Sequence, residues 1–352
     1  MTKCSIAYLA CTAALVGAAL GTTPASAAHT THVVHPGESI QKAVDAARPG
    51  DTVLLTPGTY QQSVTVSKSG LTLRGMGLGT VLQPAEKEAA TGCSAAGNGI
   101  CVTGTTAHPV RDVTVADLSV TGFARSGVFG TSTDRMTVTR VYAAKNGVWG
   151  IAQEQSVHGA FRYNHAKENG DAGLFLANTV SAEQGAKDTK GAAVESNRLE
   201  GNRIGVTVRR LRNLTVSDNY VTGNCVGMFV VGDENKPRAG ALTVQDNQIT
   251  QNNKSCPKTD RLPALQGSGI VLTGAEDTLV TRNRITGHSG KSPLSGGIVL
   301  FKSFVGVTSE RNRINDNVLD SNAPADLVNT DTGKGNTFSG NSCRASKPAG
   351  MC

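Results

Sequence analysis

Short runs of alternating apolar and polar residues recur along the chain, and each pair of runs is separated by an Asn. In RNLTVSDNYVTGN, residues 212–224, Leu214-Thr-Val-Ser alternates before Asn219 and Tyr220-Val-Thr alternates after it. A third run, Gly227-Met-Phe-Val-Val, follows. Runs this short, rich in Val, Ile and Thr and broken by Asn and Gly, are typical of β-strands. The pattern therefore predicts three short strands in each unit.

The unit repeats through most of the chain. The equivalent positions are Leu118, Val141, Asn164, Asn197, Asn219, Asn247, Asn283 and Asn312. The steps between them are 23, 23, 33, 22, 28, 36 and 29 residues. A minimal unit with insertions of variable length is typical of a solenoid. Since no segment of helix length separates the strands, we expect an all-β parallel β-helix with three sheets and about nine to ten coils.

The recurring Asn has a physical explanation in such a fold. Asn tolerates the left-handed backbone conformation that a sharp turn between two strands needs. Asn side chains at equivalent turns would also stack, each amide bonding to that of the next coil, so that a buried polar row is satisfied internally. The predicted ladder consists of Asn164, Asn197, Asn219, Asn247, Asn283 and Asn312.

Residues 36–66, PGESIQKAVDAARPGDTVLLTPGTYQQSVTV, precede the repeats and begin with a short amphipathic helix that Pro49-Gly50-Asp51 ends. One face of this helix carries Ile40, Ala43, Val44 and Ala47. This opening and the repeats resemble right-handed parallel β-helix proteins of the pectin-lyase-like superfamily, in which such a helix caps the solenoid. The resemblance covers nearly the whole chain after residue 28. The superfamily includes lyases, hydrolases, epimerases and proteins with no known activity, so it implies the fold and leaves the function open.

The first 28 residues have the pattern of a bacterial export signal. Lys3 supplies a positive charge, residues 6–20 are apolar, and Ala25-Ser26-Ala27 is a small-residue cleavage site. The apolar run is short for a membrane anchor, so we expect a secreted, extracellular protein without a membrane span. The predicted division is residues 1–28 as signal peptide and 29–352 as one β-helix domain, with 36–66 as N-terminal cap and first coil and 336–352 as C-terminal cap.

Six cysteines follow the signal peptide. Because exported proteins meet oxidising conditions, an even number favours disulfides over metal ligation. The repeat alignment places Cys225 and Cys256 in the turn before the third strand of adjacent coils, within disulfide reach. Proximity along the chain adds the pairs Cys93–Cys101 and Cys343–Cys352, and the latter would pin the C-terminal end.

The insertions indicate where a ligand would bind. Residues 180–192 and 232–240 follow third strands, whereas 252–267 and 287–295 precede them, so the third-strand sheet would be the floor of a groove. The alternation predicts that Val148 faces inward. It predicts an outward-facing row made of Phe129, Trp149, Phe175, Thr207, Phe229, Val271 and Val299.

Aromatic rings pack against the C–H faces of sugars, so this row is a candidate track for a polysaccharide. The predicted substrate-binding residues are Phe129, Trp149, Phe175 and Phe229, with Lys302 nearby. The alternative is that the inserted loops fold over the row and bury it.

The net charge of +7 favours an acidic polysaccharide as partner, although a solvated basic surface explains it equally well. With one Trp, five Tyr and no basic run, the chain gives no indication of nucleic-acid binding, and we expect a monomer. Five Met and seven His are scattered, unlike the metal-delivery clusters expected of similar copper-maturation β-helix proteins.

A lyase acting on an acidic polysaccharide needs a base for the proton α to the uronate carboxylate and positive charge for the resulting intermediate. The candidate catalytic residues are Arg209, Arg210 and His158. Asp233 and Glu234, on the next coil, are candidate Ca²⁺ ligands, and no other cofactor is indicated. Glu154 and Asp171 are further charges near the floor. For each of these residues a solvated ion pair, or an ordinary turn histidine, is the structural alternative.

Three functions remain open at this point. The first is an exported enzyme that binds and processes an acidic polysaccharide by β-elimination. The second is a non-catalytic glycan-binding or cell-surface protein on the same scaffold. The third is a structural solenoid whose floor is covered by loops, which needs neither the aromatic row nor a base. The adjacent Asp-Asp pair of polygalacturonase-type hydrolases and the Asp-Pro-His of alginate epimerases are both absent from the sequence.

Overall fold

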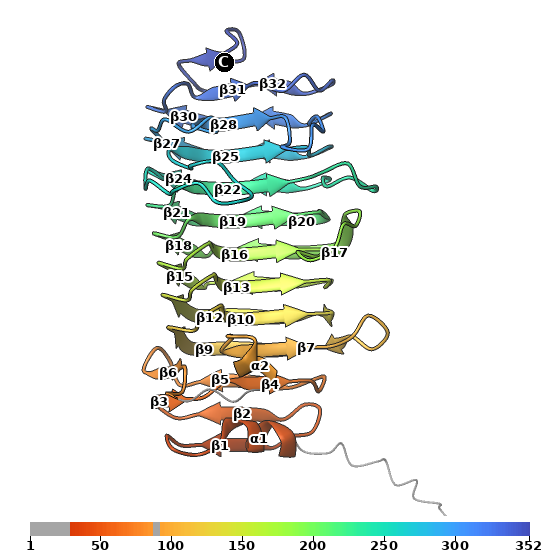
Figure 1. The fold of residues 1–352 in the computed structure, drawn as a ribbon, viewed down its shortest axis with the longest axis vertical. Helices are drawn as coiled ribbons and strands as arrows, with labels where there is room; N and C mark the ends of the chain where they lie inside the picture. The colour runs from red at the N-terminus through yellow and green to blue at the C-terminus, as the bar shows by residue number, and fades with distance from the viewer. Residues whose placement is uncertain (1–28, 87–91) are drawn as a thin grey trace, which may run out of the picture.

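The computed structural model describes residues 29–86 and 92–352. The predicted signal peptide lies outside the described residues. The strands stack as successive coils of a parallel β-helix, and the chain climbs from β1 at one end to β33 at the other (Figure 1). All the pairings between named strands are parallel, as expected for strands that recur once per coil.

The third strands form one sheet of 11 strands, in the order of the coils. They are β4 (Val64–Val66), β7 (Ile100–Thr103), β10 (Ser126–Thr131), β13 (Trp149–Glu154), β16 (Ala172–Ala177), β19 (Ile204–Arg209), β22 (Val226–Val231), β25 (Ser268–Thr273), β28 (Gly296–Phe301), β31 (Leu327–Asn329) and β33 (Ser346–Lys347). The stack therefore has slightly more coils than the nine to ten that were predicted. The strands at its two ends, β4 and β33, have only three and two residues and are the hardest to recognise in the sequence.

The first and second strands form two further faces, which join into one sheet of 20 strands. The first face contains β1 (Thr31–Val34), β2 (Thr52–Leu55), β5 (Thr72–Gly75), β14 (Ala160–Arg162), β17 (Lys187–Glu195), β20 (Leu211–Ser217), β23 (Thr243–Gln245), β26 (Leu279–Thr281), β29 (Arg313–Asn315) and β32 (Thr337–Ser339). The second contains β3 (Gly58–Gln61), β6 (Thr80–Gln83), β15 (His165–Lys167), β18 (Arg198–Glu200), β21 (Tyr220–Thr222), β24 (Gln248–Thr250), β27 (Arg284–Thr286) and β30 (Val318–Asp320).

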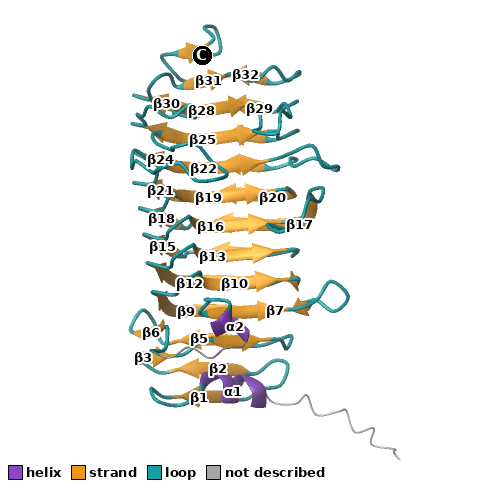
Figure 2. Cartoon of the chain, in the orientation of Figure 1, coloured by secondary structure: helices purple, strands orange, loops and turns teal. Residues whose placement is uncertain are grey.

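Two longer strands connect these faces. Strands β9 (Thr114–Thr121) and β12 (Thr137–Ala144) run through the turn, so that β9 pairs with both β5 and β6 and β12 pairs with both β14 and β15. A separate two-stranded sheet pairs β8 (Val110–Arg111) with β11 (Thr133–Asp134). Strands and connecting loops account for nearly the whole described chain, with two short helices near its N-terminal end (Figure 2).

Helix α1 (Ile40–Ala46) lies at the N-terminal end of the stack, where it covers the first coil (Figure 1). Ser39 caps it by accepting a hydrogen bond from the backbone N–H of Lys42. Ile40 and Val44 are buried against the core, as the helical spacing predicts. Strand β1 precedes the helix and pairs with β2, so the first coil begins before residue 36. Helix α2 spans Gly92–Ala95.

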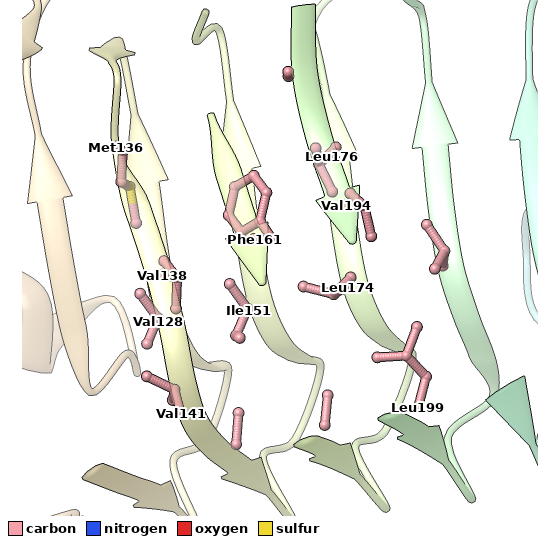
Figure 3. Close-up of a cluster of buried hydrophobic side chains, with 14 of the residues drawn as sticks. Val128, Met136, Val138, Val141, Ile151, Phe161, Leu174, Leu176, Val194 and Leu199 are labelled. Carbon is pink, nitrogen blue, oxygen red and sulfur yellow. The ribbon is translucent and has the colours of Figure 1, made fainter. Parts of the chain in front are cut away.

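The core is a continuous apolar column inside the tube (Figure 3). Val128, Ile151 and Leu174 stack on consecutive third strands, and each is fully buried. Val138 and Phe161 stack in the same way on the first face. Since each inward side chain contacts its equivalents one coil above and below, the repeat buries a continuous core without a helix layer.

The Asn ladder is present, with Asn317 in place of Asn312 and with Asn341 as a further member. The Nδ2 of Asn219 donates to Oδ1 of Asn247 at 2.9 Å, and equivalent bonds connect the column from coil to coil. Its members are Asn164, Asn197, Asn219, Asn247, Asn283, Asn317 and Asn341. Asn312 was predicted to belong to it but bonds instead with Asn336 in a separate column.

The incorrect assignment has an identifiable cause. The tetrapeptide Arg-Asn-Arg-Ile occurs at both 282–285 and 311–314. In the first copy Ile285 lies on the second face, whereas Ile314 lies on the first face and pairs with Val280. Identical residues thus occupy different strands, and Asn317 takes the place predicted for Asn312.

The turn geometry also differs from the prediction. The residue that adopts the left-handed backbone conformation is the one before each ladder Asn, such as Asp218 with φ 57° and Asp246 with φ 55°. Asn219 and Asn247 are absent from the positive-φ residues. The Asn recurs because its side-chain amide forms hydrogen bonds between coils. The left-handed backbone conformation is adopted by the residue before it.

A second column, which the sequence analysis missed, lies at the turn before the third strands. It runs five residues after the first column, and its members are Asn146, Asn169, Asn202, Asn224, Asn252, His288 and Asn322. The constant offset of five residues was visible in the sequence and would have revealed it.

Three disulfides join the pairs that were expected. Cys225–Cys256 has its Cα atoms 6.1 Å apart, and Cys93–Cys101 and Cys343–Cys352 close short segments near the two ends. No helix in the described part of the chain is long and apolar enough to cross a membrane.

Candidate functional site

The outward face of the third-strand sheet carries a second apolar cluster, separate from the core of the tube. One outward row runs Phe129, Ala152, Phe175, Thr207, Phe229, Val271 and Val299. Most of these positions match the predicted row. The exception is the second, which Ala152 occupies in place of Trp149.

Trp149 pairs in register with Ser126, three residues before the predicted position. The inward residue of its strand is Ile151, whereas Val148 packs in the outer cluster, contrary to the prediction. In this register Gly150 lies close to the next strand, where a β-carbon would be only 2.7 Å from the carbonyl oxygen of Gly173. The second Gly of GVWGI is therefore the one equivalent to the first Gly of GVFGT.

Despite this offset, the aromatic side chains form a stack. The rings of Trp149 and Phe175 are nearly parallel with centroids 4.2 Å apart, and Phe129 lies 6.5 Å from Trp149 on its other side. The guanidinium of Arg125 lies over the indole, 5.3 Å from its centroid. Trp149 Nε1 donates to Oδ2 of Asp171 at 3.1 Å, which orients the ring.

Inserted loops cover this stack and turn the predicted open track into a pocket. Trp149, Phe175 and Phe229 are only 4%, 5% and 2% exposed. The cavity above them has a volume of about 380 Å³. Its walls come from four segments, at Val180 and Glu183, at 232–234, at Arg261 and Leu262, and at 303–305. The alternative in which loops fold over the row is therefore the one that the structure shows.

Arg209, at the end of β19, lines the pocket and is partly buried. Burial, together with the neighbouring charges of Arg210 and Arg261, lowers its pKa. Within the described chain no carboxylate lies within ion-pair distance of its guanidinium. An arginine in this position is available to an anionic ligand.

Arg210 has a different environment. It is 4% exposed, and its φ of 53° places it in the left-handed backbone region directly after β19. Its guanidinium contacts the carboxylates of Asp233 and Glu183 and donates to the carbonyl of Ala182 at 2.7 Å. These contacts tie the 180–184 loop to the 232–234 loop. Arg210 thus holds the wall of the pocket.

The predicted Ca²⁺ ligands do not form a coordination set. Asp233 accepts hydrogen bonds from Arg210 and from the backbone of Asn235, while Glu234 is exposed. In the ranges 29–86 and 92–352, no group of three or more His, Cys, Asp or Glu residues is placed to hold a metal ion. The geometry uses Asp233 as the partner of an arginine, and so it gives the Ca²⁺ prediction no support.

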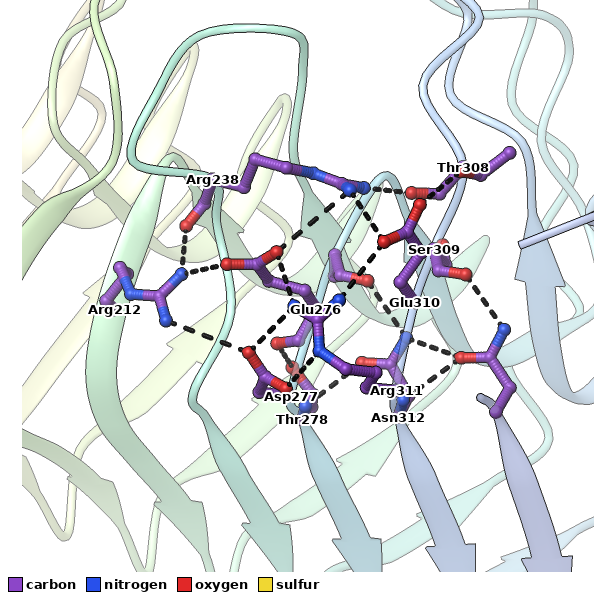
Figure 4. Close-up of polar contacts among 12 residues, drawn as sticks. Arg212, Arg238, Glu276, Asp277, Thr278, Thr308, Ser309, Glu310, Arg311 and Asn312 are labelled. Atoms are coloured by element: carbon purple, nitrogen blue, oxygen red, sulfur yellow. Dashed lines mark hydrogen bonds and ion pairs between the residues drawn. The ribbon is translucent and has the colours of Figure 1, made fainter. Parts of the chain in front are cut away.

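The 232–240 loop is held at its other end by an ion-pair network (Figure 4). Arg212 donates to Oε1 of Glu276 at 2.7 Å and to the carbonyl of Arg238 at 2.6 Å. Arg238 pairs with Glu310 at 3.4 Å. Because each of these ion pairs reaches across an intervening coil, they hold this pocket wall in place.

Two other predicted residues lie outside the pocket lining. His158 Nδ1 lies 2.7 Å from Oδ1 of Asp134, in the turn after β13. Lys302 is exposed, next to the lining residue Ser303. The structure therefore brings together Arg209, Arg210, Asp233, Glu234 and three of the four aromatics, but neither His158 nor Lys302.

Two carboxyl groups on this face have raised pKa values. Burial raises the pKa of Asp171, against the opposing effect of its hydrogen bond from Trp149. Burial also raises the pKa of Glu154, which lies two coils from Arg209 in the same row of the sheet. Asp171 lines the pocket. A carboxylate of raised pKa is a stronger base than an exposed one.

Thr207 supplies an unpaired polar atom at the floor. It lies in register between Phe175 and Phe229, is 5% exposed and lines the cavity. Its Oγ1 has no hydrogen-bond partner among the described residues. A buried hydroxyl without a partner is costly, so a polar group of a ligand would satisfy it.

Several lining residues were not predicted, including Glu183, Arg261, Leu262, Phe304 and Val305. They belong to loops whose course depends on tertiary contacts, and no repeat or alternation marks them. The insertion lengths were the only available signal.

Two families match parts of the chain. The family described as "Right handed beta helix region" matches residues 88–240, and "Periplasmic copper-binding protein (NosD)" matches residues 177–347. None of the curated proteins matches the sequence. The first family agrees with the predicted hand of the helix.

Solved structures with the same fold include the A-module of mannuronan C-5 epimerase AlgE4 of Azotobacter vinelandii, at 19% identity and a TM-score of 0.59, covering 89% of this chain and 95% of that one. The DFA-IIIase of Arthrobacter chlorophenolicus A6 is 16% identical with a TM-score of 0.61, covering 86% and 77%. Tailspike protein 2 of bacteriophage CBA120 is 12% identical with a TM-score of 0.55, covering 82% and 42%. At these identities the likeness concerns the fold.

Proposed function

We propose that this chain, a right-handed parallel β-helix protein with the pectin-lyase-like fold, binds an acidic sugar unit of a polysaccharide in the pocket over its third-strand sheet. The observation that carries the proposal is the combination of a stacked aromatic floor and an arginine without an acidic partner in one cavity. Trp149 and Phe175 offer ring surface, and Arg209 offers positive charge.

The size of the cavity sets what it can accept. About 380 Å³ lies at the lower end of the range for small-ligand sites, which is roughly 300–1,000 Å³. That volume suits one or two sugar units better than a long segment of polymer. The uncovered edges of the rings at the floor would pack against the sugar's C–H groups, while a carboxylate pairs with Arg209.

The chain acts outside the cytoplasm in this proposal. Three disulfides favour an oxidising compartment, and one of the matching families is described as periplasmic. We extend this inference to export directed by residues 1–28 and to release of the protein from the cell. Detection of a mature chain starting near residue 29 in culture medium or periplasm tests it.

Binding is tested by titrating purified mature protein with uronate trimers and with neutral trimers of the same linkage. Arg209→Gln should weaken uronate binding about tenfold, the value of one charge-assisted contact, with little effect on neutral sugars. Arg284→Gln is the matched control, because this exposed arginine lies on the second face. Equal affinity of the wild-type protein for acidic and neutral sugars would contradict the proposal.

A second candidate function, β-elimination at a bound uronate, is favoured by the placement of Asp171. Its raised pKa makes it a candidate base, and Arg209 lines the same cavity with a charge suited to an enolate-like intermediate. Incubation with uronate polymers should then yield unsaturated products, measured by ultraviolet absorbance, and Asp171→Asn should abolish them while binding persists. Binding without any product would leave the non-catalytic glycan-binding alternative.

A further inference from the structure

The insertion at residues 252–267 reaches back over earlier coils before the chain enters β25. Lys254 donates its backbone N–H to the carbonyl of Asn224 at 3.1 Å, one coil back. Its Nζ contacts the carbonyl of Gly201, a further coil back, at 2.5 Å. The segment thus forms an arm that covers part of the third-strand sheet.

The base of this arm is closed by covalent and backbone bonds. Cys256 is joined to Cys225, on the coil beneath. Cys256 and Leu265 form an antiparallel bridge, with N–H to carbonyl distances of 2.9 and 3.0 Å in the two directions. Both residues are buried. The two sides of the arm are therefore held together where it leaves the sheet.

Arg203 holds the tip of the arm from below. Only 7% of it is exposed. Its Nη1 donates to the carbonyl of Pro257 at 2.8 Å, and its Nη2 reaches the carbonyl of Pro263 at 3.5 Å. One guanidinium thus contacts both sides of the tip, in the forked geometry that only arginine provides.

The tip carries Arg261 and Leu262 to the pocket, where they line the cavity together with Arg209. Within the described chain, no acidic group lies within ion-pair distance of Arg209 or Arg261. The lining carboxylates Asp233 and Glu183 pair with Arg210. Two guanidinium groups at one cavity repel each other unless an anion lies between them.

The other lining carboxylates, those of Asp171 and Glu234, likewise form no ion pair with Arg209 or Arg261 in the described part of the chain. Asp171 accepts the hydrogen bond of Trp149 Nε1 at 3.1 Å. Glu234 is exposed to solvent. The cavity accordingly offers two unpaired cations above an aromatic floor.

We propose that residues 252–267 are an anion-recognition arm, in which Arg261 joins Arg209 in binding the carboxylate of a uronate, and that Arg203 is the positioning residue that holds the arm in place. This inference rests on the proposed function and narrows its ligand to a carboxylated sugar. Leu262 contributes an apolar contact beside the charge. The sugar would be enclosed between the arm and the aromatic floor.

The test measures binding of trigalacturonate, trimannuronate, a sulfated trisaccharide and the neutral trigalactose by calorimetry. Arg261→Gln should lower affinity for one of the uronates about tenfold and leave neutral binding unchanged. Because Arg261 is exposed, this variant should fold normally. Arg284→Gln, on the second face, should have no effect. A preference for the sulfated sugar would overturn the assignment to a carboxylate.

The positioning role is tested with Arg203→Lys, which keeps the charge but loses the fork. Its effect on uronate affinity should vanish in the Arg261→Gln background, because both changes remove the same contact. Additive losses of uronate affinity in the double variant would contradict the positioning role of Arg203. Unchanged uronate affinity in Arg261→Gln, while the wild-type protein binds, would contradict the role of residues 252–267 in anion recognition. Failure of the wild-type protein to bind any of the sugars would overturn the proposed function, and this inference with it.

Discussion

His288 occupies a place in the second column that Asn holds in most other coils. Its Nδ1 accepts from the backbone N–H of Asn252 at 3.1 Å, and its Nε2 lies 3.2 Å from the carbonyl of Ile249. Imidazole thus reproduces two bonds of an amide, with Nδ1 in the role of Oδ1 and Nε2–H in the role of Nδ2–H, but not the side-chain bond by which Asn224 donates to the next residue of the column. These bonds require the neutral ring with its proton on Nε2.

The stability of the protein should therefore depend on pH through this residue. Burial lowers the pKa of His288 from 6.5 to about 4. The unfolded chain takes up a proton as the pH falls through 6.5, whereas the folded protein does so only near 4. The contribution of His288 is complete above pH 6.5 and is lost between pH 6.5 and 4, by about 3 kcal/mol.

His288→Asn is the matching variant, since it restores the residue found in the other coils. We expect its stability to change less than that of the wild-type protein between pH 6.5 and 4. Denaturant unfolding at several pH values measures the difference. Parallel stability profiles of the two proteins would show that His288 does not titrate in this way.

At the scale of the element, the coils that carry both Asn columns have two turns of the same design. A residue in the left-handed conformation is followed by an Asn whose amide bonds to the next coil, as at Asp218-Asn219 and Gly223-Asn224. The amide of Asn219 also bonds to the carbonyls of Val194 and Ser217. Each ladder Asn thus connects three successive coils and satisfies buried backbone groups.

Asn219→Ala should be strongly destabilising, because the buried backbone N–H of Asn197 loses its acceptor and the Nδ2 of Asn197 loses one of its two. We expect a loss of about 2–4 kcal/mol in the free energy of unfolding. Asn341→Ala, at the partly exposed end of the same column, is the control and should cost less. Guanidinium unfolding measures both, and equal losses would contradict the dependence on burial.

At the scale of the whole molecule, the protein is a stack in which each strand pairs with the equivalent strands of the neighbouring coils (Figure 1). The C-terminal strand β33 pairs only with β31, so it is an exposed sheet edge. The Cys343–Cys352 disulfide encloses β33 and restrains it. In such an array, loss of one contact acts locally.

Replacing Cys343 and Cys352 by Ser should therefore open the C-terminal end without unfolding the stack. Hydrogen exchange should accelerate in β31 and β33 and stay unchanged in β16 and β19. The matched control replaces Cys93 and Cys101, which should affect β7 and spare the C-terminal end. Uniform acceleration along the chain would show that the stack unfolds as one cooperative unit.

The sequence by itself determined the repeating architecture. Alternation, the spacing of Asn and the short cap were enough for the parallel β-helix and for the Cys225–Cys256 pair, whereas the other two disulfide pairs followed from proximity along the chain. These features follow from local rules that repeat in every coil, so errors in single coils, such as Asn312 and Trp149, left the whole intact. Both errors arose where similar residue strings occupy different registers.

Only the tertiary structure decided the chemistry of the site. Three features of the site depend on how the inserted loops fold back. The loops cover the aromatic row, they place Arg210 in a wall while Arg209 lines the cavity, and they bring Arg261 to the same cavity. A loop's course follows from contacts between residues far apart in the chain, such as Arg203 with Pro257 and Pro263. Such contacts leave no periodic pattern in the sequence, so the sequence predicted the face and the structure shows how the side chains on it are arranged.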